Sequence, residues 1–200
     1  MRQLLAGAIF LVFFVTTAQV RTDAHSTHDK DGASGGSGPQ LIMIIRHGEK
    51  PEDSKEDRDP NLSPRGFERA AALAKVIPKD FPHPDFLIAT KRSSHSNRPM
   101  ETIEPLSKKL HETIEAKFSV EQYPSLAHEL LTDPKFNGKV VLIAWHHGKI
   151  PELAHALGAT EAPAKWNGKV FDRVWEITFT GSTPTWSDLP QKALPGDSEK

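Results

Sequence analysis

The sequence contains no cysteine, which excludes disulfides, a thiol nucleophile and metal sites built from thiolates. It also lacks an excess of either charge, because 25 Lys and Arg stand against 26 Asp and Glu, for a formal net charge of −1. A broad face for polyanions is therefore not expected, and nucleic acid is not predicted as a partner. With 200 residues, 37% of them hydrophobic, the chain can build one sizeable core and hardly two.

The N-terminal region has the outline of a secretory signal. Met1-Arg2-Gln3 carries a positive charge, and the apolar stretch from Leu4 to Val15 is followed by small residues. This stretch is shorter than the roughly 20 apolar residues of a membrane-spanning helix. Residues 1–24 are therefore predicted to be a signal peptide, and the protein to be exported to the periplasm or secreted. An uncleaved N-terminal anchor is the alternative, and no other membrane contact is expected.

Composition and hydrophobic patterns divide the rest of the chain. Residues 25–39 are polar and glycine-rich, which predicts a flexible linker, because few apolar residues offset the entropy of ordering. From 40 to 190 short apolar stretches alternate with helical patterns, which predicts one α/β domain. Residues 191–200 are predicted to be an irregular tail, and the irregularity to begin at Thr183, where three prolines and Gly196 follow.

Helix starts and strand patterns give the expected elements. Ser63-Pro64 should begin a helix, with Ser as N-cap and Pro in the first turn. A second helix should begin at Arg98-Pro99, with a kink or restart at Pro105. The buried face of the first helix is predicted to comprise Phe67, Ala70, Ala71, Ala74 and Ile77. The remaining expected elements are short strands at Asp85–Ala89 and Ala116–Val120, helices at Tyr123–Leu131 and Pro151–Gly158, and an edge strand within Val170–Thr180.

Two long apolar runs end in similar motifs. Leu41–Ile45 leads into Arg46-His47-Gly48, and Lys139–Ala144 leads into Trp145-His146-His147-Gly148. Unbroken apolar runs are typical of strands covered on both faces, as in parallel sheets. Ligands in open α/β sheets bind beyond the carboxyl ends of the strands. We therefore expect imidazoles from the two segments to meet at one edge of one sheet.

The groups expected at that edge are mostly cationic or neutral donors. They include Arg46, His47 and one of His146 and His147, together with Arg98 from the junction after the next strand. The helix beginning at Pro151 should point its N-terminus the same way. Guanidinium groups bind phosphate oxygens in bidentate geometry, and a neutral imidazole can attack phosphorus in line. A phosphate group is the predicted occupant.

These motifs resemble the histidine phosphatase superfamily, which has the phosphoglycerate mutase-like fold. The resemblance covers nearly all of residues 40–160 and implies a three-layer α/β/α architecture, with a mostly parallel central sheet, helices on both faces and an antiparallel edge strand. Four stretches carry it in the family's order: Leu41–Lys50, Leu62-Ser63-Pro64-Arg65-Gly66, Arg98 through Leu106, and Val140–Gly148.

The resemblance implies a phosphatase in which His47 becomes a phosphohistidine and no metal or other cofactor is required. Arg46 and Arg98 would hold the phosphoryl oxygens and a second histidine would complete the clamp. For that histidine, counting from the strand favours His146, whereas the family's His-Gly pattern favours His147, which we prefer. Gly48 allows the backbone to approach a bound group, and Glu49 is expected to orient His47 or its neighbours. A proton donor for the leaving group is not evident, and Glu121 is the best positional candidate.

The substrate is expected to be a small phosphorylated compound or a phosphoprotein. A phosphomutase is the alternative within the enzymes, which export makes less favourable. A phosphate-binding or interaction module without turnover is the alternative outside them. A metallohydrolase built on His146, His147 and a carboxylate is a third, although adjacent residues of a strand point to opposite faces and rarely share one ion.

Overall fold

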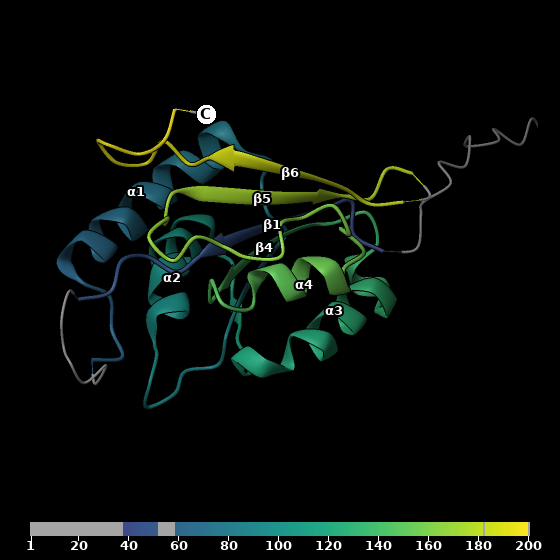
Figure 1. Ribbon diagram of the computed structural model, residues 1–200, viewed down its shortest axis with the longest axis horizontal. Helices are drawn as coiled ribbons and strands as arrows, with labels where there is room; N and C mark the ends of the chain where they lie inside the picture. The colour runs from purple at the N-terminus through teal and green to yellow at the C-terminus, as the bar shows by residue number, and fades with distance from the viewer. Residues whose placement is uncertain (1–37, 52–58, 182, 200) are drawn as a thin grey trace, which may run out of the picture. The chain divides into compact units, whose positions relative to one another are not determined.

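The computed structural model describes residues 38–51, 59–181 and 183–199. Within them a six-stranded sheet has the order β3-β2-β4-β1-β5-β6 (Figure 1). The strands pair in parallel from β3 to β1, whereas β5 runs antiparallel to β1, and β6 antiparallel to β5. Their bounds are β1 Leu41–Arg46, β2 Phe86–Ala89, β3 Ile114–Glu115, β4 Val140–Trp145, β5 Arg173–Thr178 and β6 Thr185–Pro190.

Helices cover both faces of this sheet, so the predicted three-layer, mostly parallel α/β fold is confirmed. Helices α1 (Pro64–Asp80) and α2 (Arg98–Leu110) lie on one face, and α3 (Tyr123–Thr132) and α4 (Ile150–Ala156) on the other (Figure 1). Two short 3-10 helices, η1 (Val120–Gln122) and η2 (Pro134–Phe136), flank α3. Helix α1 begins as predicted, because the Ser63 hydroxyl accepts the Gly66 N–H at 3.1 Å and Pro64 occupies the first turn.

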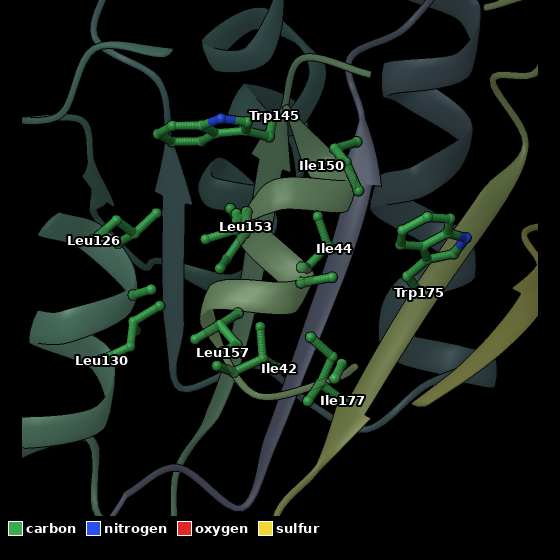
Figure 2. Packing of buried hydrophobic residues seen from close by; sticks show 14 of the residues in the cluster. Ile42, Ile44, Leu126, Leu130, Trp145, Ile150, Leu153, Leu157, Trp175 and Ile177 are labelled. Atoms are coloured by element: carbon green, nitrogen blue, oxygen red, sulfur yellow. The ribbon is translucent and has the colours of Figure 1, made fainter. Parts of the chain in front are cut away.

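The central strands are apolar throughout because each of their faces packs against a helical layer. In β1, Ile42 and Ile44 contact the layer of α3 and α4, whereas Met43 and Ile45 contact the layer of α1 and α2. All four side chains are fully buried. Figure 2 shows the first of these clusters, in which Ile42 and Ile44 meet side chains of α3, α4 and the neighbouring strands.

Two helical predictions need correction. Phe67 and Ala71 are exposed, and the buried face of α1 instead includes Arg69 and Leu73. The face was misjudged because Arg69, a charged residue, points inward and is paired there. The restart considered at Pro105 is absent, because α2 is continuous from Arg98 to Leu110, and a kink there stays a prediction. The buried side chains of α2 on both sides of the proline, Ile103 and Leu106, anchor the helix across that position.

The strand predictions failed where strands are short or exposed. The segment Val170–Thr180 does not supply the sheet edge, because β5 lies between β1 and β6. Residues after Thr183 were predicted to be irregular, yet Thr185–Pro190 forms β6. Proline cannot donate to a ladder but fits strand ends and edges, so Pro190 was compatible with a strand. Likewise, Ala116–Val120 forms no strand, since β3 comprises only Ile114–Glu115.

The predicted signal peptide, and the linker apart from Gly38 and Pro39, lie outside the described residues. The N–H of Gly38 donates to the Asn137 side chain at 2.8 Å, which ties the start of the domain to the turn before β4. None of the helices in the described ranges has the length and apolarity needed to cross a bilayer. Residues 191–199 contain neither helix nor strand.

Candidate active site

A pocket of about 310 Å³ opens at the carboxyl ends of β1 and β4. It receives the residues that follow these strands, the first residue of α2, and residues of η1. The structure therefore brings together the side chains that the sequence motifs singled out. The lining residues are Arg46, His47, Lys50, Arg98, Val120, Glu121, His146, His147, Gly148 and Lys149.

His47 is buried at the base of this pocket in a neutral form. Its Nδ1 lies 2.7 Å from the carbonyl oxygen of Gly48, which fixes the proton on Nδ1 and leaves the lone pair on Nε2. Burial lowers the pKa of His47 well below its ordinary value; the hydrogen bond to the Gly48 carbonyl opposes this effect, and the positive charges of Arg46 and Arg98 add to it. At neutral pH the side chain therefore presents an unprotonated nitrogen.

Close backbone packing holds His47 at this position. Its N–H donates to the Trp145 carbonyl at 3.0 Å, which extends the pairing of β1 with β4 by one residue. The N–H of Gly48 donates to the Thr102 hydroxyl of α2 at 2.9 Å. A Cβ on Gly48 would lie 3.0 Å from the Gly66 carbonyl oxygen, so the loop can meet the first turn of α1 only without a side chain there.

Two buried guanidinium groups face the pocket without carboxylate partners. Arg46 donates through one terminal nitrogen to the carbonyls of Gly168 at 2.7 Å and Val170 at 3.0 Å, and it stacks over Phe171. Arg98 donates to the Asp59 carbonyl at 2.9 Å. Among the described residues, neither guanidinium forms an ion pair, and the buried Nε of each has no acceptor. Carbonyl oxygens orient the two groups but do not neutralise them, so the pocket favours an anion.

The lowered pKa of Arg46 shows that the two guanidinium charges are poorly stabilised in this pocket. Burial lowers the pKa of Arg46 to about 10, and the nearby charge of Arg98 adds to the effect, although Glu49 opposes it. Both arginines are nearly inaccessible to water. Two like charges this poorly solvated are destabilising in an empty pocket, and a bound dianion would relieve both. The carbonyls and Phe171 that hold Arg46 come from the segment before β5, which no sequence motif had marked.

The two neighbouring histidines point to different places. The His146 ring lies 5.1 Å from the His47 ring, in an edge arrangement, and its Nε2 lies 3.5 Å from the Thr90 hydroxyl. The His147 ring instead lies against Gly168, where an added Cβ would come within 3.4 Å of its Nε2. Burial lowers the pKa of both histidines, that of His146 to about 4. His146 therefore faces the candidate nucleophile, and His147 faces the segment that holds Arg46.

Acid should destabilise the protein through His146. Its pKa is about 4 in the folded protein and 6.5 ordinarily, so between these values the unfolded chain binds a proton that the folded protein does not. From pH 7 to pH 5 this group alone should lower the free energy of unfolding by about 2 kcal/mol. Urea unfolding at the two pH values measures the loss. Between pH 7 and pH 5 the free energy of unfolding of His146→Asn should fall by about 2 kcal/mol less than that of the wild type. An equal fall in both proteins would contradict the lowered pKa.

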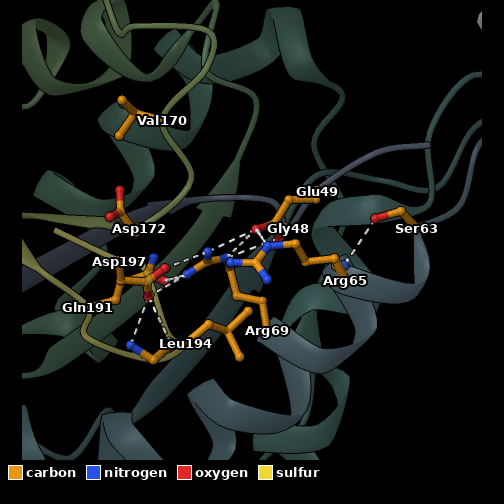
Figure 3. Close-up of polar contacts among 12 residues, drawn as sticks. Gly48, Glu49, Ser63, Arg65, Arg69, Val170, Asp172, Gln191, Leu194 and Asp197 are labelled. Atoms are coloured by element: carbon orange, nitrogen blue, oxygen red, sulfur yellow. Dashed lines mark hydrogen bonds and ion pairs between the residues drawn. The ribbon is translucent and has the colours of Figure 1, made fainter. Parts of the chain in front are cut away.

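Among the described residues the Glu49 side chain bonds to Arg69 and not to His47, so its expected role in orienting His47 or its neighbours stays a prediction. Its carboxylate accepts from Arg69 Nε and from a terminal nitrogen of Arg69 at 2.8 to 3.1 Å. On its other side, Arg69 donates to both oxygens of Asp197 at 2.9 Å and to the Gln191 side chain at 3.1 Å. Figure 3 shows Arg69 between the two carboxylates. The residue after the His47-Gly48 pair is thus linked to the C-terminal tail.

Glu121 lies at the rim of the pocket, where 68% of its side chain is exposed. Its carboxylate forms an ion pair with the ammonium group of Lys149 at 3.1 Å, and Lys149 also lies 3.8 Å from Glu152. Lys149 must release Glu121 before that carboxylate can hold a proton for a leaving group. The position of Glu121 is compatible with the predicted donor role, but its present partner competes with it.

Two other features bear on where the site lies. Within residues 38–51, 59–181 and 183–199, no three His, Asp or Glu side chains gather closely enough to hold a metal ion. A larger pocket of about 420 Å³ is lined by residues such as Pro39, Leu157 and Phe179, near the start of β1. It lies at the amino end of the parallel strands and is lined mainly by apolar groups and glycines. The pocket at the carboxyl ends carries the reactive groups.

Comparison with known proteins gives the same fold. The profile of the histidine phosphatase superfamily (branch 1) matches residues 42–120. A mycobacterial glucosyl-3-phosphoglycerate phosphatase aligns with 76% of this chain and 97% of its own, at 14% identity and a TM-score of 0.55. Phosphoglycerate mutase from Bacillus anthracis aligns over 78% and 95%, at 13% identity and a TM-score of 0.54. The protein histidine phosphatase SixA in complex with tungstate aligns over 76% and 97%, at 13% identity and a TM-score of 0.51. No curated protein sequence matches the chain.

Proposed function

We propose that this chain, which has the phosphoglycerate mutase-like fold and the sequence pattern of the histidine phosphatase superfamily over residues 42–120, is a phosphatase that acts through a phosphohistidine on His47. One observation carries the proposal. A buried, neutral imidazole shares a pocket with two guanidinium groups that have no counter-charge among the described residues. An unprotonated nucleophile beside a site for a dianion is what phosphoryl transfer requires.

In the proposed reaction, the lone pair on His47 Nε2 attacks phosphorus in line with the leaving oxygen. The N–P bond forms as the P–O bond breaks, and the leaving group departs with the electron pair. Arg46 and Arg98 donate to the phosphoryl oxygens through N–H groups that include their unsatisfied Nε atoms. Water then attacks the phosphohistidine, which releases inorganic phosphate and restores the neutral imidazole.

We assign the second imidazole of the clamp to His146 instead of His147, because the His146 ring lies against His47. His146→Ala should lower kcat by about a hundredfold, the usual effect of removing one group that stabilises transition-state charge. His147→Ala should lower it by only a few fold, since this ring contacts the segment at Gly168. Steady-state kinetics of the two variants show which histidine acts with His47. Equal, mild losses of kcat in both would contradict the paired-imidazole arrangement.

The leaving group is the least constrained part of the reaction. Aryl phosphates, acyl phosphates and phosphohistidine depart without full protonation, whereas alkyl phosphates need a proton donor. Because Lys149 engages Glu121, substrates of the first kind fit the described site best. A phosphoprotein and a small phosphorylated molecule both fall within this class, and the structural likeness to a protein histidine phosphatase is compatible with the former.

The test is hydrolysis of p-nitrophenyl phosphate by the full chain in excess EDTA. Turnover that survives the chelator supports the phosphatase, and activity that disappears with it would favour a metallohydrolase. Tight binding of inorganic phosphate without any turnover would instead favour a phosphate-binding module. Transfer of the phosphoryl group to an added alcohol acceptor, in preference to water, would favour a phosphomutase. Export, which rests on residues 1–24 alone, remains part of our proposal and makes the mutase less favourable.

A further inference from the structure

A second pocket of about 320 Å³ adjoins the candidate active site. The two share Arg98, Val120 and His146 as lining residues. The substituent of a phosphate bound between His47 and Arg98 could therefore extend along these three shared residues into the second pocket. We name it the Lys91 pocket, and its residues are Thr90, Lys91, Ser93, His95, Ser96, Arg98, Ser119, Val120 and His146.

The lining of the Lys91 pocket is rich in donors, and no carboxylate of the described residues belongs to it. Four of its nine residues, Thr90, Ser93, Ser96 and Ser119, carry hydroxyl groups. The Ser96 side chain is the most informative, because the residue is only 5% exposed and its Oγ has no hydrogen-bond partner. A buried hydroxyl without a partner is rare in a folded protein, and that of Ser96 calls for a partner that the described residues do not supply.

Lys91 supplies the positive charge of this pocket. The side chain is exposed, and no described residue forms an ion pair with its ammonium group. Its backbone N–H donates to the Phe118 carbonyl at 2.7 Å, which fixes the residue next to η1. Arg98, at the boundary with the first pocket, adds a second charge. An ammonium group, a guanidinium group and the hydroxyls of Ser93 and Ser96 are donors suited to an anion, whereas the Ser119 hydroxyl already donates to the Gln122 side chain at 3.0 Å.

The loop that builds the pocket is closed by its own hydrogen bonds. The N–H of Ser93 donates to the Ser96 carbonyl at 3.1 Å, and the Ser93 hydroxyl accepts the N–H groups of His95 and Ser96. At its end, the N–H of Asn97 donates to the Pro60 carbonyl at 2.7 Å. The backbone of the loop is therefore held in place before any ligand arrives, which lowers the entropic cost of binding.

We propose that the Lys91 pocket binds a second anionic group, a carboxylate or another phosphate, on the leaving-group side of the phosphorylated substrate. This inference rests on the proposed function, since the first pocket must hold the scissile phosphate. It narrows the substrate class to molecules with two anionic ends. Lys91 and Ser96 would bind the second of these ends. Leaving groups without an anionic end would leave the Ser96 hydroxyl and the Lys91 charge without partners.

Non-hydrolysable phosphonates test this without requiring turnover. Alkylphosphonates and ω-carboxyalkylphosphonates of matched, increasing chain length are titrated into the full chain by calorimetry at low salt. At the best length the carboxylate should tighten binding about tenfold, the usual scale of one charge-assisted hydrogen bond. An alkane-diphosphonate of that length distinguishes a second phosphate from a carboxylate as the preferred group.

Variants assign the effect to the pocket. Lys91→Gln should reduce the tenfold advantage to about twofold or less, and Ser96→Ala should reduce it in part. Lys75→Gln, on the exposed face of α1, serves as the matched control and should retain the full advantage.

Equal affinities of the two series at every length, or an advantage that survives Lys91→Gln, would overturn the proposal. Failure of p-nitrophenyl phosphate hydrolysis would count against the phosphatase alone, because phosphonate binding needs no chemistry. Absence of any phosphonate binding would overturn both.

Discussion

His47→Ala should lower the turnover of p-nitrophenyl phosphate by at least about a thousandfold, the scale seen when a covalent nucleophile is removed. The imidazole is 3% exposed, its pKa is lowered well below the ordinary value by burial, and it shares the pocket with both arginines. Steady-state kinetics measure the loss. Rapid quenching of the wild-type enzyme should also trap an acid-labile phosphoenzyme that is absent from the variant.

The control for this substitution is His128→Ala, which removes an exposed imidazole of α3 that does not line the pocket and should keep full activity. Because His47 is buried, alanine leaves a cavity and can lower stability. His47→Gln, which fills most of the space, separates the two effects, and it should be equally inactive while unfolding close to the wild-type urea concentration. Retention of most activity by either folded variant would show that another group is the nucleophile.

The parts of this fold that could be predicted from the sequence are those governed by local patterns. Residues Leu41–Ile45 are apolar without interruption because successive side chains point to opposite faces of the sheet, and an apolar cluster covers each face. Parallel strands end at the same edge of the sheet, so the motifs after β1 and β4 had to be neighbours. These two facts were sufficient to place Arg46, His47 and the His146-His147 pair in one pocket.

The parts that could not be predicted depend on pairings between distant segments. The carbonyls of Gly168 and Val170 orient Arg46 from more than 120 residues away, and nothing in their own pattern indicates an arginine. The choice between His146 and His147 depends on the backbone direction after the last residue of β4, which hydrophobic periodicity does not define. One usable signal was overlooked, namely that Arg69 lies in line with Gly66, Ala70 and Leu73 on the buried face of α1. A charge on that face requires a buried partner.

Arg69→Met should be among the most destabilising single substitutions of the domain, with a loss of about 3–5 kcal/mol in the free energy of unfolding. Its side chain is 3% exposed, and the side chains of its partners Glu49 and Asp197 are 14% and 4% exposed. Without the guanidinium group, two mostly buried carboxylates lose their hydrogen bonds and repel each other. Asp197 also accepts the N–H groups of Ala193 and Leu194, so the tail should loosen with it.

Urea unfolding of Arg69→Met measures this loss, and Arg65→Gln is the matched control. Arg65 belongs to the same helix and lies 3.5 Å from the same Glu49 oxygen, but its side chain is 52% exposed, so its removal should change stability by less than about 1 kcal/mol. Adding Glu49→Gln and Asp197→Asn to Arg69→Met should restore part of the stability, because the stranded charges are then gone. If the single substitution and the triple one are equally destabilised, the loss comes from packing and not from unpaired carboxylates. If Arg69→Met is no worse than Arg65→Gln, the tail is not held to the active-site loop through this ion-pair network.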